Sequence, residues 1–171
     1  MAIDSDIIEP SVDPDTRKLA VRNVVGQNDA GTRTEINVRD YAPVITDEPS
    51  SLGGTNSAPS PNETLLAALV GCEGVIIRGV ASAINFEYSK VEFKAESRID
   101  LRGPKGVPGV RPYFETVTVD VILHTDEPPE RIEKLKKNVE FRCPIVNLLR
   151  AADVELVVNW TKKSAASNPV E

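Results

Sequence analysis

Residues 59–85 read PSPNETLLAALVGCEGVIIRGVASAIN, and they predict the longest helix of the chain. From Leu65 to Ile84 almost every side chain is apolar or small, and only Glu73 and Arg78 carry charge. A helix that is apolar all round is buried on every side. If this helix runs from about Asn62 to Ile84, it is about 35 Å long, which is close to the width of a small domain. Because one small domain cannot surround it, we expect a second copy of the chain to cover it, in a homodimer.

Strand patterns surround this helix on both sides in the sequence. Before it, we expect a hairpin and a third short strand, at residues 17–26, 32–40 and 42–49. After it, alternating apolar residues predict two strands, at 89–101 and 113–123. We then expect an amphipathic helix at 127–140, a short helix at 143–152 and a last strand at 154–160. This order predicts an α+β fold. We expect a tail at 1–15, a single domain at 16–162 and a tail at 163–171.

The composition narrows the class of function. The chain has 171 residues, a net charge of −6 and a pI near 5.0. An acidic chain is a poor partner for nucleic acid or an anionic membrane, because both require basic surface. No stretch of about 18 apolar residues is free of charge, so we expect neither a transmembrane helix nor a secretory signal. Two cysteines in such a chain indicate the reducing cytoplasm, and one histidine with two distant cysteines argues against a metal site.

The two cysteines lie 71 residues apart, at positions 72 and 143. Cys72 is in the middle of the long helix, where a free cysteine often serves as a small core residue. Cys143 precedes Pro144, which places it at the N-cap of the short helix, where amide hydrogens and the helix dipole lower the pKa of a thiol. Either both cysteines are core residues too far apart to bond, or they form a reactive thiol pair.

Two charged residues of the long helix need partners if they are buried. Glu73 follows Cys72 directly, and a carboxylate beside a thiolate raises the thiol's pKa unless the carboxylate is paired. We expect such a pairing with Arg78. Glu63 lies nine residues before Cys72, about 13.5 Å along the axis, so one continuous helix does not bring the two into contact.

Two motifs resemble the OsmC/Ohr family of osmotically induced and organic hydroperoxide resistance proteins, with the OsmC-like branch nearest. The first is TDEPSSLGGTNSAPSPNETLLAALVGC at residues 46–72, and the second is CPIVNLL at residues 143–149. With the order of strands, the resemblance covers roughly residues 17–162. It implies an OsmC-like fold, in which antiparallel sheets are wrapped around two long central helices of an intertwined homodimer.

The resemblance also implies a chemistry. In the family the helix cysteine, here Cys72, is the peroxidatic thiol and the Cys-Pro cysteine, here Cys143, is the resolving thiol. A glutamate at the helix start, here Glu63, and an arginine from the first hairpin assist them. Arg33 is the nearest candidate for that arginine, with Arg39 and Arg22 as alternatives.

A thiol-dependent peroxidase of this kind reduces organic hydroperoxides to alcohols through a sulfenic acid, which the second cysteine resolves as a disulfide. It needs no cofactor or metal, only an external dithiol or small-thiol reductant. The apolar helix favours alkyl or fatty-acyl hydroperoxides as substrates. We expect a homodimer with no nucleic-acid or membrane partner. The alternative is a non-catalytic OsmC-like dimer that binds an apolar or thiol-reactive small molecule or senses oxidants.

Overall fold

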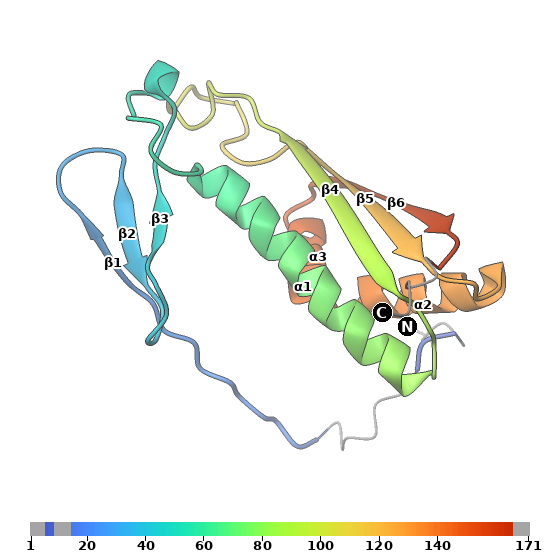
Figure 1. Ribbon diagram of the computed structural model, residues 1–171. Helices are drawn as coiled ribbons and strands as arrows, with labels where there is room; N and C mark the ends of the chain where they lie inside the picture. Colours follow the sequence, from blue (N-terminus) through green and yellow to red (C-terminus); the bar gives the residue numbers. More distant parts are fainter. Residues whose placement is uncertain (1–5, 9–14, 166–171) are drawn as a thin grey trace. The chain divides into compact units, whose positions relative to one another are not determined.

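The computed structural model describes residues 6–8 and 15–165 (Figure 1). The order of elements is the predicted one, and the α+β class is confirmed. The chain divides into two compact units, residues 9–67 and residues 1–8 with 68–171. The elements are β1 Val25–Asn28, β2 Thr34–Asn37, β3 Val44–Thr46, the short 3-10 helix η1 Ser50–Leu52, α1 Pro61–Ala83, β4 Lys90–Arg98, β5 Thr116–His124, α2 Pro129–Arg142, α3 Pro144–Ala151 and β6 Glu155–Lys163.

The first unit holds the antiparallel sheet β1-β2-β3. The first strand begins at Val25 rather than at residue 17, and it continues through two residues that the sequence analysis placed in the turn. Asn28 explains why the strand ends later than expected. Its side-chain amide donates hydrogen bonds to the carbonyl oxygens of Gly31 and Arg33, so the turn closes after residue 28. Pairing therefore starts between Asn28 and Thr34.

Asp47 organises the loop between β3 and α1. Its carboxylate is fully buried and accepts hydrogen bonds from the hydroxyl groups of Thr32, Thr55 and Ser57. These bonds hold the pKa of the carboxyl well below its usual range. The loop also needs Gly54, because a Cβ there would lie 1.7 Å from the carbonyl oxygen of Glu48. The acidic and glycine residues of the first motif thus have a structural role in this loop.

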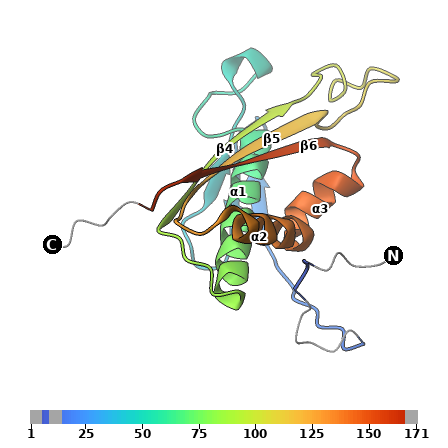
Figure 2. The ribbon, with the colours of Figure 1, turned by 90° about the vertical axis from the view of Figure 1, so that its right-hand side faces the viewer.

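The second unit is built on the sheet β4-β5-β6, and α1, α2 and α3 lie on one side of that sheet (Figure 2). Alternate residues of β5 are fully buried, at positions 117, 119, 121 and 123. The prediction of purely antiparallel sheets is wrong for this one, because β5 and β6 are parallel. A parallel pair needs a long crossover connection, and α2 and α3 supply it between the two strands.

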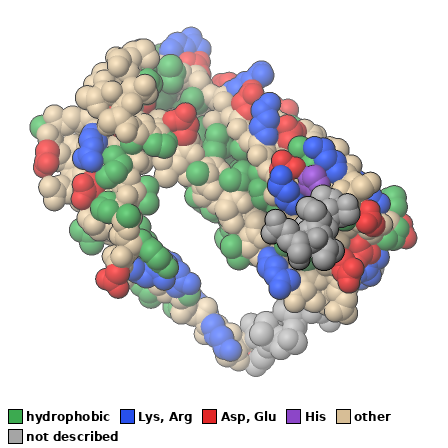
Figure 3. Space-filling view, in the orientation of Figure 1, with side chains coloured by type: hydrophobic (Ala, Val, Ile, Leu, Met, Phe, Trp, Pro, Cys, Tyr) green, Lys and Arg blue, Asp and Glu red, His purple; other side chains and the backbone are tan. Residues whose placement is uncertain are grey.

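Within the chain itself α1 is covered on one side only. Its buried residues are Leu69, Glu73, Ile77, Val80 and Ala81. The expectation that the helix is buried on every side is therefore not met by one copy, since Val75 is 70 % exposed. Hydrophobic side chains gather along the visible side of α1 (Figure 3). By length and composition α1 is also long and apolar enough to cross a membrane, a test that the core helix of a soluble protein passes as well.

The predicted tails fall largely outside the described residues, but residues 6–8 lie against α2. The backbone N–H of Ile8 donates to the side-chain oxygen of Asn138, and Arg142 donates to the carbonyl oxygen of Ile8. Asn138 is fully buried, so these bonds satisfy a polar group inside the unit. This short part of the expected N-terminal tail is therefore held in place by α2.

Candidate active site

The structure brings the two cysteines together. The sulfur atoms of Cys72 and Cys143 lie 3.3 Å apart, and the Cys143 thiol donates a hydrogen bond to the Cys72 sulfur. Both thiols are free, and a disulfide would require the sulfur atoms to approach by about 1.3 Å. Cys72 is partly exposed whereas Cys143 is fully buried. The interpretation in which both are core residues too far apart to bond is therefore wrong.

The two helices that meet at Cys143 explain how it is positioned. Cys143 ends α2 and is also the N-cap of α3, and Pro144 is the first residue of that helix. The N-cap position is the one predicted. The expected low pKa is wrong, because burial raises the pKa of the thiol to about 11, although hydrogen bonds with the backbone at Val146 and Ile145 act in the opposite direction. Cys143 consequently stays protonated near neutral pH and serves as the hydrogen-bond donor.

Glu73 forms no ion pair with any of the described residues. Its side chain is fully buried, and neither carboxyl oxygen has a hydrogen-bond partner among the described residues. The expected pairing with Arg78 is wrong, since Arg78 is exposed and lies on another part of the helix surface. Burial raises the pKa of Glu73 to about 7, and the negative charge of Glu140 adds to this effect. The site therefore contains a carboxyl group that titrates near neutral pH.

Glu63 caps the start of α1. Its carboxylate accepts hydrogen bonds from the backbone N–H and the hydroxyl of Ser60, at 2.7 Å and 2.8 Å, and Ser60 in turn accepts one from the backbone N–H of Glu63. This reciprocal arrangement is a capping box. The sequence analysis missed it, although Ser-Pro-Asn-Glu at residues 60–63 carries its spacing. The catalytic role of Glu63 stays a prediction.

The candidate arginines belong to the first unit, whereas both cysteines belong to the second. Arg33 is half exposed and forms an ion pair with Glu35 at 3.8 Å. Arg39 lies over the ring of Tyr41, 4.6 Å from its centroid. In the part of the chain that the structure describes, no arginine donates a hydrogen bond to Cys72. The assignment of Arg33 as the activating cation therefore stays a prediction.

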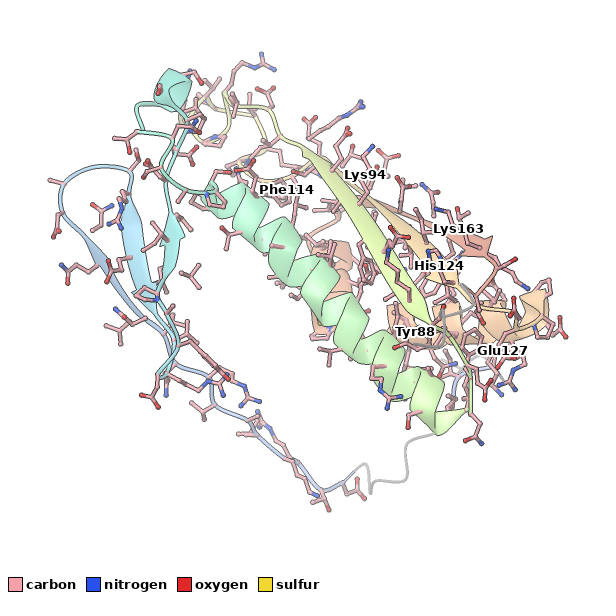
Figure 4. All side chains as sticks on the ribbon, viewed as in Figure 1. Tyr88, Lys94, Phe114, His124, Glu127 and Lys163 are labelled. Atoms are coloured by element: carbon pink, nitrogen blue, oxygen red, sulfur yellow. The ribbon has the colours of Figure 1, made fainter. Side chains whose placement is uncertain are left out.

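The second unit also contains an open cavity of about 840 Å³, and neither cysteine lines it. Tyr88 and Glu127, which do line it, lie at the same end of the sheet as His124 (Figure 4).

Within residues 6–8 and 15–165 there is no group of three His, Cys, Asp or Glu side chains that could hold a metal ion. The two thiols of Cys72 and Cys143, in contact with each other, offer the chemistry of a dithiol.

This α+β fold, with two free thiols in contact across a helix junction, defines a dithiol protein of the OsmC-like class. The family model described as OsmC-like protein matches residues 54–158, and the chain belongs to that family. No curated protein matches the sequence.

Solved structures share the fold at low sequence identity. An OsmC-like protein from Mycoplasma pneumoniae is 17 % identical, with a TM-score of 0.71, over 84 % of this chain and 97 % of its own. An organic hydroperoxide resistance protein OsmC from Legionella pneumophila is 19 % identical, with a TM-score of 0.67, over 85 % and 99 %. The organic hydroperoxide resistance protein OhrB of Bacillus subtilis is 19 % identical, with a TM-score of 0.60, over 84 % and 100 %.

Proposed function

We propose that this protein is a thiol-dependent peroxidase that reduces organic hydroperoxides to alcohols. The observation that carries the proposal is the hydrogen bond from the Cys143 thiol to the Cys72 sulfur, at 3.3 Å. A partly exposed sulfur that accepts a hydrogen bond is suited to attack a substrate, and the buried donor beside it is suited to trap the product. The similar structures from Legionella and Bacillus are named as organic hydroperoxide resistance proteins, which supports the same activity.

The reaction balances with these two thiols alone. The Cys72 thiolate attacks the terminal oxygen of R–O–O–H, the O–O bond breaks, and Cys72 sulfenic acid and an alkoxide form. The alkoxide takes up a proton and leaves as the alcohol. Cys143 then attacks the Cys72 sulfur, the hydroxyl leaves as water with the Cys143 proton, and a disulfide remains. An external dithiol or small thiol reduces the disulfide, and the protein needs no cofactor.

A stoichiometric titration tests the proposal. Reduced protein is mixed with cumene hydroperoxide or hydrogen peroxide, and free thiols are counted by mass spectrometry. We expect two thiols to be lost per peroxide, faster with the organic peroxide, because most residues of α1 on either side of Cys72 are apolar or small. In Cys72→Ser the rate should fall by on the order of 10³-fold or more, since the nucleophile is gone. If Cys72 stays reduced in excess organic peroxide, the peroxidase proposal fails.

Glu73 favours a second candidate function. Glu73 follows Cys72 directly in the chain, and its buried carboxyl has no hydrogen-bond partner among the described residues. A carboxylate beside a thiolate disfavours the thiolate unless the carboxylate is paired. A slow thiol pair that still forms a disulfide is a redox sensor or a thiol-reactive binding protein rather than an efficient enzyme. Disulfide formation without repeated turnover in the presence of excess dithiol would select this candidate.

We further propose that the protein acts as a homodimer in the cytoplasm, with α1 of each copy covered by the other. The exposed side of α1 carries Val75, and added Cβ atoms at Gly71 and Gly79 would meet nothing within 4 Å, so a second backbone has room to approach. Covering this side removes apolar surface from water. Neither nucleic acid nor membrane is part of the proposal.

The dimer proposal predicts that Val75→Glu dissociates the assembly. A charge placed in an apolar interface without a partner is costly, so we expect the dimer dissociation constant to rise by at least about 100-fold. Analytical ultracentrifugation over a concentration series measures it. Val107→Glu is the matched control, because Val107 is 42 % exposed and belongs to the loop between β4 and β5 rather than to α1. A monomeric wild-type protein, or an equally strong Val75→Glu dimer, would contradict the proposal.

A further inference from the structure

One residue joins α2 to α3, and that residue is Cys143. It lies between Arg142, the last residue of α2, and Pro144, the first residue of α3. Its backbone is extended, with φ −68° and ψ 114°, so the two helices do not continue into each other. The groups that hold this junction therefore also hold the Cys143 sulfur, which lies 3.3 Å from the sulfur of Cys72.

The junction deprives two carbonyl oxygens at the end of α2 of the donors that a continuous helix would give them. In such a helix the carbonyl of Glu140 would accept from the N–H of residue 144, and the carbonyl of Phe141 from that of residue 145. Pro144 has no N–H. The N–H of Ile145 forms its hydrogen bond with the Cys143 sulfur instead. Both carbonyl oxygens are therefore free to accept from other donors.

The side chain of Asn147 is the donor to both. Its amide nitrogen donates to the carbonyl oxygens of Glu140 and Phe141, at 3.2 Å and 3.0 Å. The same nitrogen donates to the carbonyl oxygen of Cys143 at 2.8 Å. Two amide hydrogens serve three acceptors, so at least one hydrogen is shared, as is common at helix ends. One side chain of α3 thus ties the end of α2 to the residue that carries the second thiol.

A second residue of α3 contacts the same end of α2. Arg150 donates to the carbonyl oxygen of Glu140 at 3.2 Å and to its carboxylate at 2.6 Å. These bonds hold α3 against α2, but they reach Glu140 alone. Asn147 also reaches Phe141 and Cys143, so it is the side chain that joins the helix end directly to the thiol-bearing residue.

We propose that Asn147 is a positioning residue of the resolving step, because its hydrogen bonds hold the Cys143 sulfur where it can attack the oxidised Cys72. This inference rests on the roles that the proposed function gives to the two cysteines. Asn147 itself touches neither sulfur in the printed hydrogen bonds, and it acts through the backbone of the junction.

The resolving step balances without any further group. In it the S–O bond of the Cys72 sulfenic acid breaks, an S–S bond to Cys143 forms, and the hydroxyl leaves as water with the Cys143 proton. The two sulfur atoms must approach to about 2.05 Å. A junction without the Asn147 bonds samples more positions, so this approach becomes rarer and the step becomes slower. The attack of Cys72 on peroxide forms no bond to Cys143, so it depends far less on the junction.

Release of a coloured thiolate from the aryl disulfide DTNB tests the proposal without peroxide. Cys72 attacks DTNB, which gives a mixed disulfide and one aryl thiolate. Cys143 then attacks the mixed disulfide, which gives the protein disulfide, a second aryl thiolate and a proton. In Asn147→Ala we expect the second release to be slower by about 10-fold or more, because a misplaced group loses effective concentration. The first release should stay within about 3-fold of the wild-type rate, since it depends on the thiolate character and exposure of Cys72.

Two further variants make the result specific. Asn147→Asp keeps the shape of the side chain but has no N–H to donate, so it should slow the second release as Asn147→Ala does. It decides the question if Asn147→Ala does not fold. Asn159→Ala removes a side-chain hydrogen bond of 2.9 Å to Asp120 from β6, and it should change neither release.

The split between the two releases separates positioning from a merely structural role, which would affect both steps or neither. A second release at the wild-type rate in the Asn147 variants, an equal slowing of both releases, or a wild-type protein that releases only one thiolate overturns the proposal. The outcome is independent of the peroxide titration, because DTNB replaces peroxide as the oxidant. A protein whose Cys72 is inert to peroxide therefore loses the proposed activity and can still show the role of Asn147.

Discussion

Cys143→Ser is expected to slow turnover strongly while leaving the first reaction with peroxide intact. The serine hydroxyl can still donate a hydrogen bond to the Cys72 sulfur, but it cannot form a disulfide. Cys72 should therefore gain one oxygen atom, and then a second one in excess peroxide, because no thiol traps the sulfenic acid. Turnover with a dithiol reductant should fall on the order of 100-fold, since a neighbouring thiol reacts far faster than one in solution. Mass spectrometry and a peroxide assay measure both effects.

Cys143→Ala is the matched variant. It removes both the disulfide and the hydrogen-bond donor, so its first step should be slower than that of Cys143→Ser if the hydrogen bond at 3.3 Å orients Cys72. Equal first-step rates would assign the contact to packing alone. Full turnover in either variant would show that Cys143 is not the resolving thiol.

Glu73→Gln is expected to stabilise the reduced protein at alkaline pH and to change little at acid pH. The pKa of Glu73 is raised from 4.5 to about 7 in the folded protein. Between these values the native protein holds a proton that the unfolded chain has released, so the wild-type free energy of unfolding falls as the pH rises through this window. Above it the full penalty of the buried carboxylate is present. Glutamine does not titrate, and the gain should reach about 2–3 kcal/mol at pH 8.

Urea unfolding at pH 5 and pH 8, with reductant present, measures this gain. Glu133→Gln serves as the control because that side chain is exposed, and its free energy of unfolding should follow the wild-type at both values. Parallel pH dependences for Glu73→Gln and the wild-type would mean that Glu73 is ionised or paired in the folded protein in solution.

Local patterns in the sequence predicted the elements well where they are set by neighbouring residues. Three features illustrate this: the apolar run after Pro61, the alternation in β5 and the Cys-Pro pair at the start of α3. Each depends on residues of a single helix or strand. Turn details were less accurate, since the side-chain hydrogen bonds of Asn28 moved the end of β1. The spacing of Ser60 and Glu63 is that of a capping box, whereas the family resemblance implied a catalytic role for Glu63.

What the sequence by itself determined was the order of elements, the family, and the placement of one cysteine inside the long helix and the other at a helix start. The contact between the sulfur atoms and the direction of their hydrogen bond were decided by tertiary structure, because they join residues 71 positions apart. Burial was decided there as well. It raises the pKa of Cys143 against the local effect of the helix, and it also raises the pKa of Glu73. Desolvation depends on everything packed around a group and not only on its neighbours in the chain.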